Sequence, residues 1–400
     1  MLRRLILLAL WASAALAQPQ SKLFEQVGPI LAGLSQITGW KVERKVPAEI
    51  LHQADFKRMM QEHSSPKQAR AEELTLKMFG LVPPDFNLMG ETVDLLSEQA
   101  AAFYDYNKKR LFILDSTKDD EEAQLALVHE LAHALADQHH NLGKYMKEGN
   151  PDDDASTARQ AVMEGQATWL SWAYLFWTRT GRGEIPENRL DELAKSAGAE
   201  GPVYSSAPLY IRESLVFPYN QGIRFVDAVF RKLGRGAFDE VFDHPPVSTQ
   251  QILHPSAYFS DQKPDMTDAP TLDATLGKPA ARQFRVLAEG ALGEFDVSAL
   301  LRQYGEERAG AAEATHFRGG SYRLYENKHD KRPVLTFVAD WDSPEAAETF
   351  LALYRQVLKG KWKKMEVSAP SATELSGTGD DGKFQVRIVG NAVESREGLP

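Results

Sequence analysis

One short motif constrains both the local structure and the chemistry of this chain: His129-Glu130-Leu131-Ala132-His133. Residues four apart on an α-helix stand on one face, with roughly 5 to 6 Å between their Cβ atoms. Two imidazoles in this arrangement can bind the same ion, and zinc takes nitrogen ligands at about 2.0 to 2.1 Å. The motif therefore predicts a helix that presents His129 and His133 to one metal ion, with Glu130 as a base beside them.

The residues around the motif favour a buried helix. Four acidic residues at 119–122 precede it and Gly143 follows it, which is typical of a helix start and a helix end. The two histidines have apolar neighbours on almost every side, namely Leu125, Leu127, Val128, Leu131, Ala132, Ala134 and Leu135. A helix of this composition lies inside a domain, where its side chains are held rigidly.

A third ligand is expected from a second helix, which we predict from about Ser156 to Thr178. Catalytic zinc sites use three protein ligands and leave the fourth position to water or substrate. Glu164, in the string VMEGQATW, has mainly apolar neighbours, among which an unpaired carboxylate is costly. Because the chain has no cysteine, its ligands must be histidines and carboxylates. We expect one Zn²⁺ per chain. The alternatives to a metal site are that the two histidines are bonded to carboxylates and that Glu164 is solvated.

These two strings resemble the gluzincin zinc metallopeptidases, in which HExxH on one helix is completed by a glutamate from a following helix. The likeness covers roughly residues 100–180, and HELAHALAD, with Asp137, is similar to the active-site helix of the thermolysin type. That type has an aspartate four residues after its glutamate ligand, where this chain has Thr168, so the resemblance is to a less familiar, exported branch. A hydroxyl there could still orient His129 or His133, though less strongly. The resemblance implies a mainly helical, zincin-like domain that cleaves a protein or peptide.

A β-hairpin is predicted just before the motif. The string AAFYDYNKKRLFILD reads as two short strands of β-prone residues with a turn at 107–109. The resemblance implies that one of them is an edge strand beside the cleft, to which an extended peptide could add through backbone hydrogen bonds. An ordinary structural hairpin is the alternative.

Candidates for a donor to the oxyanion lie further along the chain. A zinc peptidase needs such a donor opposite the metal. His254, in STQQILHP, resembles a residue of a segment that follows the catalytic helices in related enzymes, and Tyr219 and His244 are the other candidates. Local packing around the neighbouring prolines is the alternative role for these side chains.

The domain organisation follows from composition. Residues 1–17, with Arg3 and Arg4, an apolar run and Ala15-Leu16-Ala17, read as a signal peptide, so we expect an exported protein, periplasmic or extracellular. Residues 18–260 form the metallopeptidase domain, with a helical part at 22–100 and the metal-site core at 100–180. Residues 261–279 read as a linker.

Residues 280–400 are expected to form a small C-terminal domain. The patterns indicate a helix at about 281–304, strands at 321–326 and 334–340, a helix at 343–360, and two further strands. This order suggests an antiparallel sheet with helices on one face, for which a ferredoxin-like arrangement is one option. The predicted fold class of the whole chain is therefore α+β, and a protein partner could bind this domain.

Composition narrows the partners and the function. A formal net charge of −10 disfavours nucleic acid as a partner. The apolar run at the N-terminus is too short to span a bilayer, so no stable membrane anchor is expected after signal cleavage. We predict an exported zinc metallopeptidase in which His129, His133 and Glu164 bind the metal and Glu130 is the base. The alternatives are a catalytically weak or inactive zinc-binding scaffold and a hydrolase of non-peptide amides.

Overall fold

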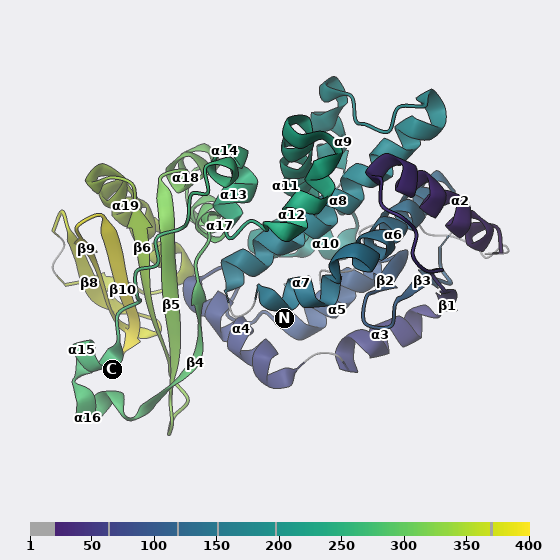
Figure 1. Ribbon diagram of the computed structural model, residues 1–400. Helices are drawn as coiled ribbons and strands as arrows, with labels where there is room; N and C mark the ends of the chain where they lie inside the picture. The colour runs from purple at the N-terminus through teal and green to yellow at the C-terminus, as the bar shows by residue number, and fades with distance from the viewer. Residues whose placement is uncertain (1–20, 63–64, 118–119, 150–151, 197, 369–370) are drawn as a thin grey trace.

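The computed structural model describes residues 21–62, 65–117, 120–149, 152–196, 198–368 and 371–400 (Figure 1). The predicted signal peptide lies outside these residues. A helical part with a small sheet is followed by a C-terminal antiparallel sheet with its own helices, which confirms the α+β class. Among the described helices, none combines the length and the apolar character that a membrane crossing requires.

Of the N-terminal helices, the first packs against the predicted metal-site helices, whereas α4 packs against strands of the C-terminal sheet. α4 begins with Pro66 in its first turn, and the hydroxyl of Ser65 accepts the N–H of Gln68 at 3.5 Å. Residues 40–46 form neither a helix nor a strand, and Pro47 directly precedes the first strand. The helices of this part are α2 (Ser21–Thr38), α3 (Gln53–Glu62), α4 (Pro66–Phe79) and α5 (Leu88–Gln99).

A three-stranded sheet flanks the metal-site helices. It consists of β1 (Ala48–Leu51), β2 (Ala102–Asp105) and β3 (Arg110–Leu114), in the order β1-β3-β2. β1 runs parallel to β3, whereas β2 and β3 form the predicted antiparallel hairpin. β2 is therefore an edge strand, as expected.

Two long helices, α8 (Asp153–Thr180) and α11 (Leu209–Leu233), cross at a pair of glycines. A Cβ on Gly165 would lie 2.2 Å from the backbone carbon of Gly222, and a Cβ on Gly222 would lie 2.1 Å from the carbonyl oxygen of Ala161. Gly165 therefore serves the approach of α8 to α11, since only glycine lets these backbones meet.

The other helices of this part are short, apart from α6. They are α6 (Glu121–His140), α7 (Leu142–Glu148), α9 (Leu190–Ser196), α10 (Pro202–Ser206), α12 (Ala237–Asp243), α13 (Thr249–Leu253) and α14 (Pro255–Phe259), with single 3₁₀ turns at Glu187–Arg189 and Gly234–Gly236.

The C-terminal sheet has seven antiparallel strands in the order β4-β5-β6-β10-β9-β8-β7. This order differs from a ferredoxin-like fold. The predicted helix at 281–304 is half wrong, since its first part is the edge strand β4, whose bulge between Val286 and Ala288 breaks the alternation that marks a strand. The strands are β4 (Phe284–Ala291), β5 (Phe317–Asn327), β6 (Pro333–Trp341), β7 (Glu366–Val367), β8 (Glu374–Gly379), β9 (Gly382–Val389) and β10 (Ala392–Leu399).

Five helices accompany this sheet: α15 (Leu272–Leu276), α16 (Lys278–Ala281), α17 (Glu294–Tyr304), α18 (Glu307–Ala314) and α19 (Pro344–Lys361). The segment that we predicted as a linker runs along the sheet, because Asp265 donates its N–H to the Arg318 carbonyl at 2.8 Å and Thr267 donates to Asp340 at 2.9 Å. One apolar core extends from Leu23 to Val393. The two parts therefore pack together, with α4 and the start of α8 beside β4 (Figure 1).

Candidate metal centre

α6 presents the HExxH motif from the interior of the protein. The helix is capped by Asp120, whose carboxylate accepts the N–H of Ala123 at 2.9 Å, and Glu121 and Glu122 follow in its first turn. The helix ends at His140, where Asn141 takes a left-handed conformation, so Gly143 was not needed to stop it. His129, Glu130 and His133 are 1%, 1% and 7% exposed, as the apolar flanks predicted.

α8 brings Glu164 to the two imidazoles. Oε2 of Glu164 lies 3.1 Å from Nε2 of His129 and 3.3 Å from Nε2 of His133, and the two Nε2 atoms are 3.1 Å apart. Three ligands placed about 2.0 to 2.1 Å from a tetrahedral zinc ion are separated from one another by roughly 3.3 Å. The three atoms therefore form a triangle of the size that such an ion needs.

Glu130 adds a fourth group next to this triangle. Ligand atoms of His129, Glu130 and His133 lie within 4.8 Å of one another, so these three residues could also hold a metal ion. The Glu164 oxygen is closer to both nitrogens, and we regard it as the better third ligand for that reason. This leaves Glu130 to act on a neighbouring molecule.

Burial and mutual contacts shift the pKa values of the ligands. Burial lowers the pKa of His129, while at His133 the effect of burial is outweighed by Glu164, so the pKa of His133 is raised. Burial alone would raise the pKa of Glu164, but the charge of His133 and hydrogen bonds from both imidazoles lower it to about 2. The carboxylate is therefore ionised, as a metal ligand must be.

The edge strand β2 orients Glu130. The N–H of Tyr104 donates a hydrogen bond of 2.6 Å to Oε2 of Glu130, while burial raises the pKa of this carboxyl to about 8. Its other oxygen, Oε1, has no hydrogen-bond partner among the described residues. One oxygen is thus fixed by the backbone, and the other can accept a proton. The sequence predicted the edge strand but not this contact.

Buried polar atoms without partners support an ion at this centre. Among the described residues, Oε1 of Glu164 and Oγ1 of Thr168 also make no hydrogen bond. An unsatisfied buried acceptor is costly, and a cation beside the carboxylates would reduce that cost. Thr168, which we expected to orient a histidine, makes no such bond. The set of two imidazoles and carboxylates suits zinc.

The structure places Tyr219 at the centre. Its ring stacks on that of His129, with centroids 5.9 Å apart, and only 3% of the residue is exposed. Burial, the negative charges of Glu164 and Glu130 and a hydrogen bond with Glu164 raise the pKa of its hydroxyl far above the ordinary value. The hydroxyl therefore stays protonated, as a donor must.

His254 and His244 are engaged elsewhere. Nε2 of His254 lies 2.8 Å from Oε1 of Glu294, at the start of α17, and this contact raises the pKa of the imidazole. His244 lies 3.2 Å from Glu240, and its side chain is 74% exposed. The structure gives neither ring a contact with the metal triangle among the described residues, so Tyr219 replaces His254 as our first candidate donor.

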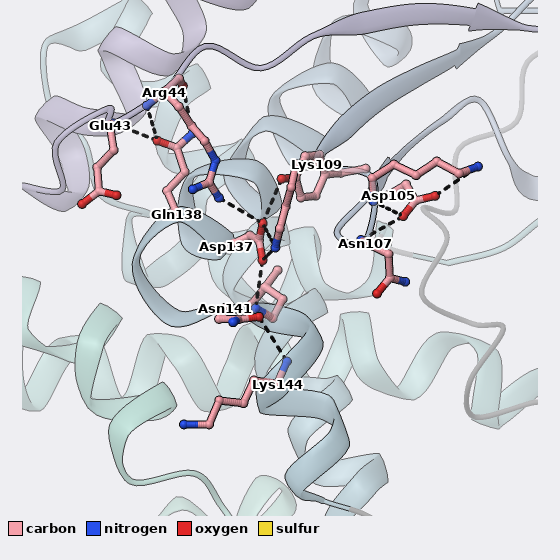
Figure 2. A network of polar contacts seen from close by, with 12 residues as sticks. Glu43, Arg44, Asp105, Asn107, Lys109, Asp137, Gln138, Asn141 and Lys144 are labelled. Carbon is pink, nitrogen blue, oxygen red and sulfur yellow. Dashed lines mark hydrogen bonds and ion pairs between the residues drawn. The ribbon is translucent and has the colours of Figure 1, made fainter.

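A polar network fixes the far end of α6 to the hairpin, and the sequence signalled only part of it. Asp137, one turn beyond His133, accepts hydrogen bonds of 2.7 and 2.8 Å from Nζ of Lys109 and one of 2.9 Å from the Tyr104 hydroxyl (Figure 2). Arg44 adds a contact of 3.4 Å. Lys109 has a positive φ of 54°, which turns the hairpin so that its side chain reaches Asp137. Tyr104 thereby links Asp137 to Glu130.

The C-terminal part matches a family model. Residues 282–400 match a domain of unknown function, DUF8575, which covers less than half of the chain and none of the metal centre. Searches of curated proteins and of solved structures return no match. The function must therefore be argued from the site itself.

Proposed function

We propose that this protein is an exported, zinc-dependent metallopeptidase. The observation that carries the proposal is the triangle of ligand atoms from His129, His133 and Glu164, with sides of 3.1 to 3.3 Å, beside a carboxylate with one free oxygen. When bound, zinc polarises a carbonyl and lowers the pKa of water from about 15.7 towards 7.

The residues of the chain supply the other parts of the reaction. Oε1 of Glu130 takes the proton of the attacking water and later gives it to the leaving amine. The N–H of Tyr104 holds the second oxygen of that carboxylate, so the base keeps one orientation throughout. The hydroxyl of Tyr219 donates a hydrogen bond to the oxyanion that develops on the scissile carbonyl.

A second candidate is a zinc-binding exported scaffold with little or no turnover. The observation that favours it is the burial of the whole site. His133 is the most exposed of its four residues, and only 7% of it is exposed, while Glu164 is 0% exposed. Thr168 stands where the thermolysin type has an aspartate, which favours the same alternative. In this case the C-terminal domain would bind a protein partner.

Metal analysis and a peptide-cleavage assay separate the two candidates. We expect one equivalent of zinc in the wild type and in Glu130→Gln, with chelator-sensitive cleavage of a mixed peptide library by the wild type alone. Turnover by the Glu130→Gln variant equal to that of the wild type would refute the role of the base. One equivalent of zinc with no cleavage in either protein would support the scaffold, and a protein without bound metal would contradict both.

A further inference from the structure

The amide of Tyr104 faces away from the β2–β3 hairpin and towards Glu130. The N–H of Leu114 donates to the carbonyl of Ala101 at 2.9 Å, so Ala101 is paired with the neighbouring strand through its backbone. Residues of an antiparallel pair alternate between hydrogen-bonded and non-hydrogen-bonded positions, and the register over 102–105 is regular. The backbone groups of Tyr104 therefore point outward, and its N–H meets Oε2 of Glu130 at 2.6 Å.

The side chain of Tyr104 is fixed at its other end. Its hydroxyl donates a hydrogen bond of 2.9 Å to Oδ2 of Asp137, and only 5% of the residue is exposed. Burial and the negative charge of Asp137 raise the pKa of this hydroxyl above its ordinary value, so it stays a donor. One residue thus connects Asp137 to Glu130 by two hydrogen bonds, one from its side chain and one from its backbone.

Asp137 is itself held from several sides, and its side chain is 0% exposed. Its two oxygens lie 2.8 and 2.7 Å from Nζ of Lys109. Oδ1 also accepts the N–H of Leu142 at 3.0 Å, and Arg44 adds its contact of 3.4 Å to Oδ2 (Figure 2). A buried carboxylate depends on such partners, because losing one leaves its charge less compensated. The point to which Tyr104 is bonded is therefore a rigid one.

The same end of α6 also holds the segment that leads into β1. Oε1 of Gln138 accepts the N–H of Glu43 at 2.8 Å and that of Arg44 at 3.1 Å, and its Nε2 donates to the carbonyl of Arg44 at 3.1 Å. The three-stranded sheet is thus bonded to the last turns of α6 through Asp137 and Gln138. Nearer the middle of the helix, the amide bond to Glu130 joins the two elements.

We propose that Asp137, Lys109 and Tyr104 are positioning residues for the base of the proposed metallopeptidase, because they hold β2 where its amide bonds to Glu130. The inference rests on the proposed function and adds three residues that act through Glu130. Without the anchor the strand can shift, and a displacement of about 1 Å can lower turnover by about 100-fold. The loss should appear in kcat, since binding of the substrate does not require the base.

Tyr104→Phe tests this role by kinetics. The variant keeps the ring and the amide, and Asp137 keeps its other donors. We expect kcat for peptide cleavage to fall about tenfold, with the KM and zinc content of the wild type, at a temperature at which circular dichroism shows the protein to be folded. The control is Tyr145→Phe, whose buried hydroxyl has no hydrogen-bond partner among the described residues and whose loss should leave turnover unchanged. Equal turnover of the two variants would overturn the proposal.

The charge at position 109 gives a second kinetic test. Lys109→Met removes a cation from Asp137 and should lower kcat about tenfold. Lys109→Arg keeps a cation there and should recover most of that turnover. Equal losses in the two variants would overturn the role of Lys109.

Hydrogen exchange of the Tyr104 amide tests the same link without catalysis. The whole chain is labelled with ¹⁵N-tyrosine, and Tyr104→Phe identifies the resonance because it lacks it. We expect exchange at least tenfold faster than in the wild type in Asp137→Asn and Lys109→Met, as in Glu130→Ala, which removes the acceptor. The amide of Tyr354, in α19, reports any general loss of stability, so the change at Tyr104 must exceed the change there. Unchanged exchange in both variants of the network would overturn the proposal.

Failure of this inference differs from failure of the proposed function. A wild type that binds zinc and cleaves no peptide would refute the metallopeptidase, and the exchange rates would still decide whether the network holds the amide against Glu130. Faster exchange with an unchanged kcat would overturn the role in catalysis.

Discussion

At the scale of single residues, the backbone of an edge strand orients Glu130, the candidate base. Oε2 of Glu130 accepts a hydrogen bond of 2.6 Å from the N–H of Tyr104. The hydroxyl of Tyr104 also donates a hydrogen bond to Asp137. Strand β2 is thus fixed to α6 at two points, and the base cannot turn without moving the strand.

Tyr219→Phe tests the oxyanion donor. If the hydroxyl of Tyr219 stabilises the transition state, its loss should lower kcat by about 10- to 1,000-fold with little change in KM. Zinc content should stay at one equivalent. The control is Tyr145→Phe, because Tyr145 is also buried and its hydroxyl has no hydrogen-bond partner among the described residues. Equal activity of the two variants would remove Tyr219 from the mechanism.

Lys109→Met tests the network around Asp137. The carboxylate of Asp137 is buried and loses its two shortest ion-pair contacts, while Tyr104 and Arg44 remain. We expect the free energy of unfolding in urea to fall by about 1 to 2 kcal/mol. Lys108→Met is the control, because the half-exposed ammonium of Lys108 makes only long contacts among the described residues: 3.6 Å to Asp105, 4.0 Å to the sulfur of Met59 and 5.5 Å to the ring centre of Phe112. A change under about 0.5 kcal/mol is expected there, and equal effects would contradict the prediction.

At the scale of elements, the position of Glu164 depends on how closely α8 meets α11. The glycines at 165 and 222 allow backbone contact at the turn that carries Glu164. Tyr219 lies almost one turn before Gly222 and so reaches the same centre. The two helices therefore bring a candidate metal ligand and a candidate donor together.

Gly222→Ala should force these helices apart. The new Cβ would lie 2.1 Å from the carbonyl oxygen of Ala161, which is backbone and cannot move aside alone. We expect a loss of about 1 to 3 kcal/mol of unfolding free energy and weaker zinc binding, measured by urea unfolding and by competition with a chelator. Gly28→Ala in α2 meets no atom within 4 Å and should be neutral or stabilising by up to about 1 kcal/mol. A neutral Gly222→Ala would show that the close approach is unnecessary.

At the scale of the whole molecule, the start of α8 joins the part with the candidate metal centre to the C-terminal domain. Asp154 accepts the N–H of Thr249, at the start of α13, at 3.0 Å, and a Cβ on Gly293 would touch its carboxylate. Asp153 accepts the hydroxyl of Tyr322 from β5. Only 3% of Asp154 is exposed, so this aspartate lies inside the junction although it stands at a helix start.

Asp154→Asn tests this junction through pH. Burial raises the pKa of Asp154 to about 7, above its ordinary value of 3.8. The folded protein therefore holds a proton that the unfolded chain releases, so unfolding free energy falls as the pH rises from about 4 to 7. The variant has no such carboxyl, so its free energy of unfolding does not fall in this way and should exceed that of the wild type by up to about a few kcal/mol at pH 8. The control is Asp85→Asn, a substitution on the surface, and a pH dependence of Asp154→Asn no larger than that of the control would contradict the assignment.

The sequence by itself determined the local features of the site. The spacing of His129 and His133, the acidic residues before them and the apolar flanks depend on neighbours within a few turns, so α6 and the β2–β3 hairpin were predicted close to where they lie. Periodicity and capping depend on residues close together in the chain, so they can be recognised in the sequence alone.

Only the tertiary structure decided which distant groups meet. Tyr219 and not His254 lies beside His129, the N–H of Tyr104 holds Glu130, and Gly165 faces Gly222, because these contacts depend on how whole elements pack. The strand β4 was missed for a related reason, since its bulge removes the alternation and its pairing with β5 provides the hydrogen bonds. Contacts between elements far apart in the chain leave no regular pattern in the sequence, so packing alone could select among the candidates.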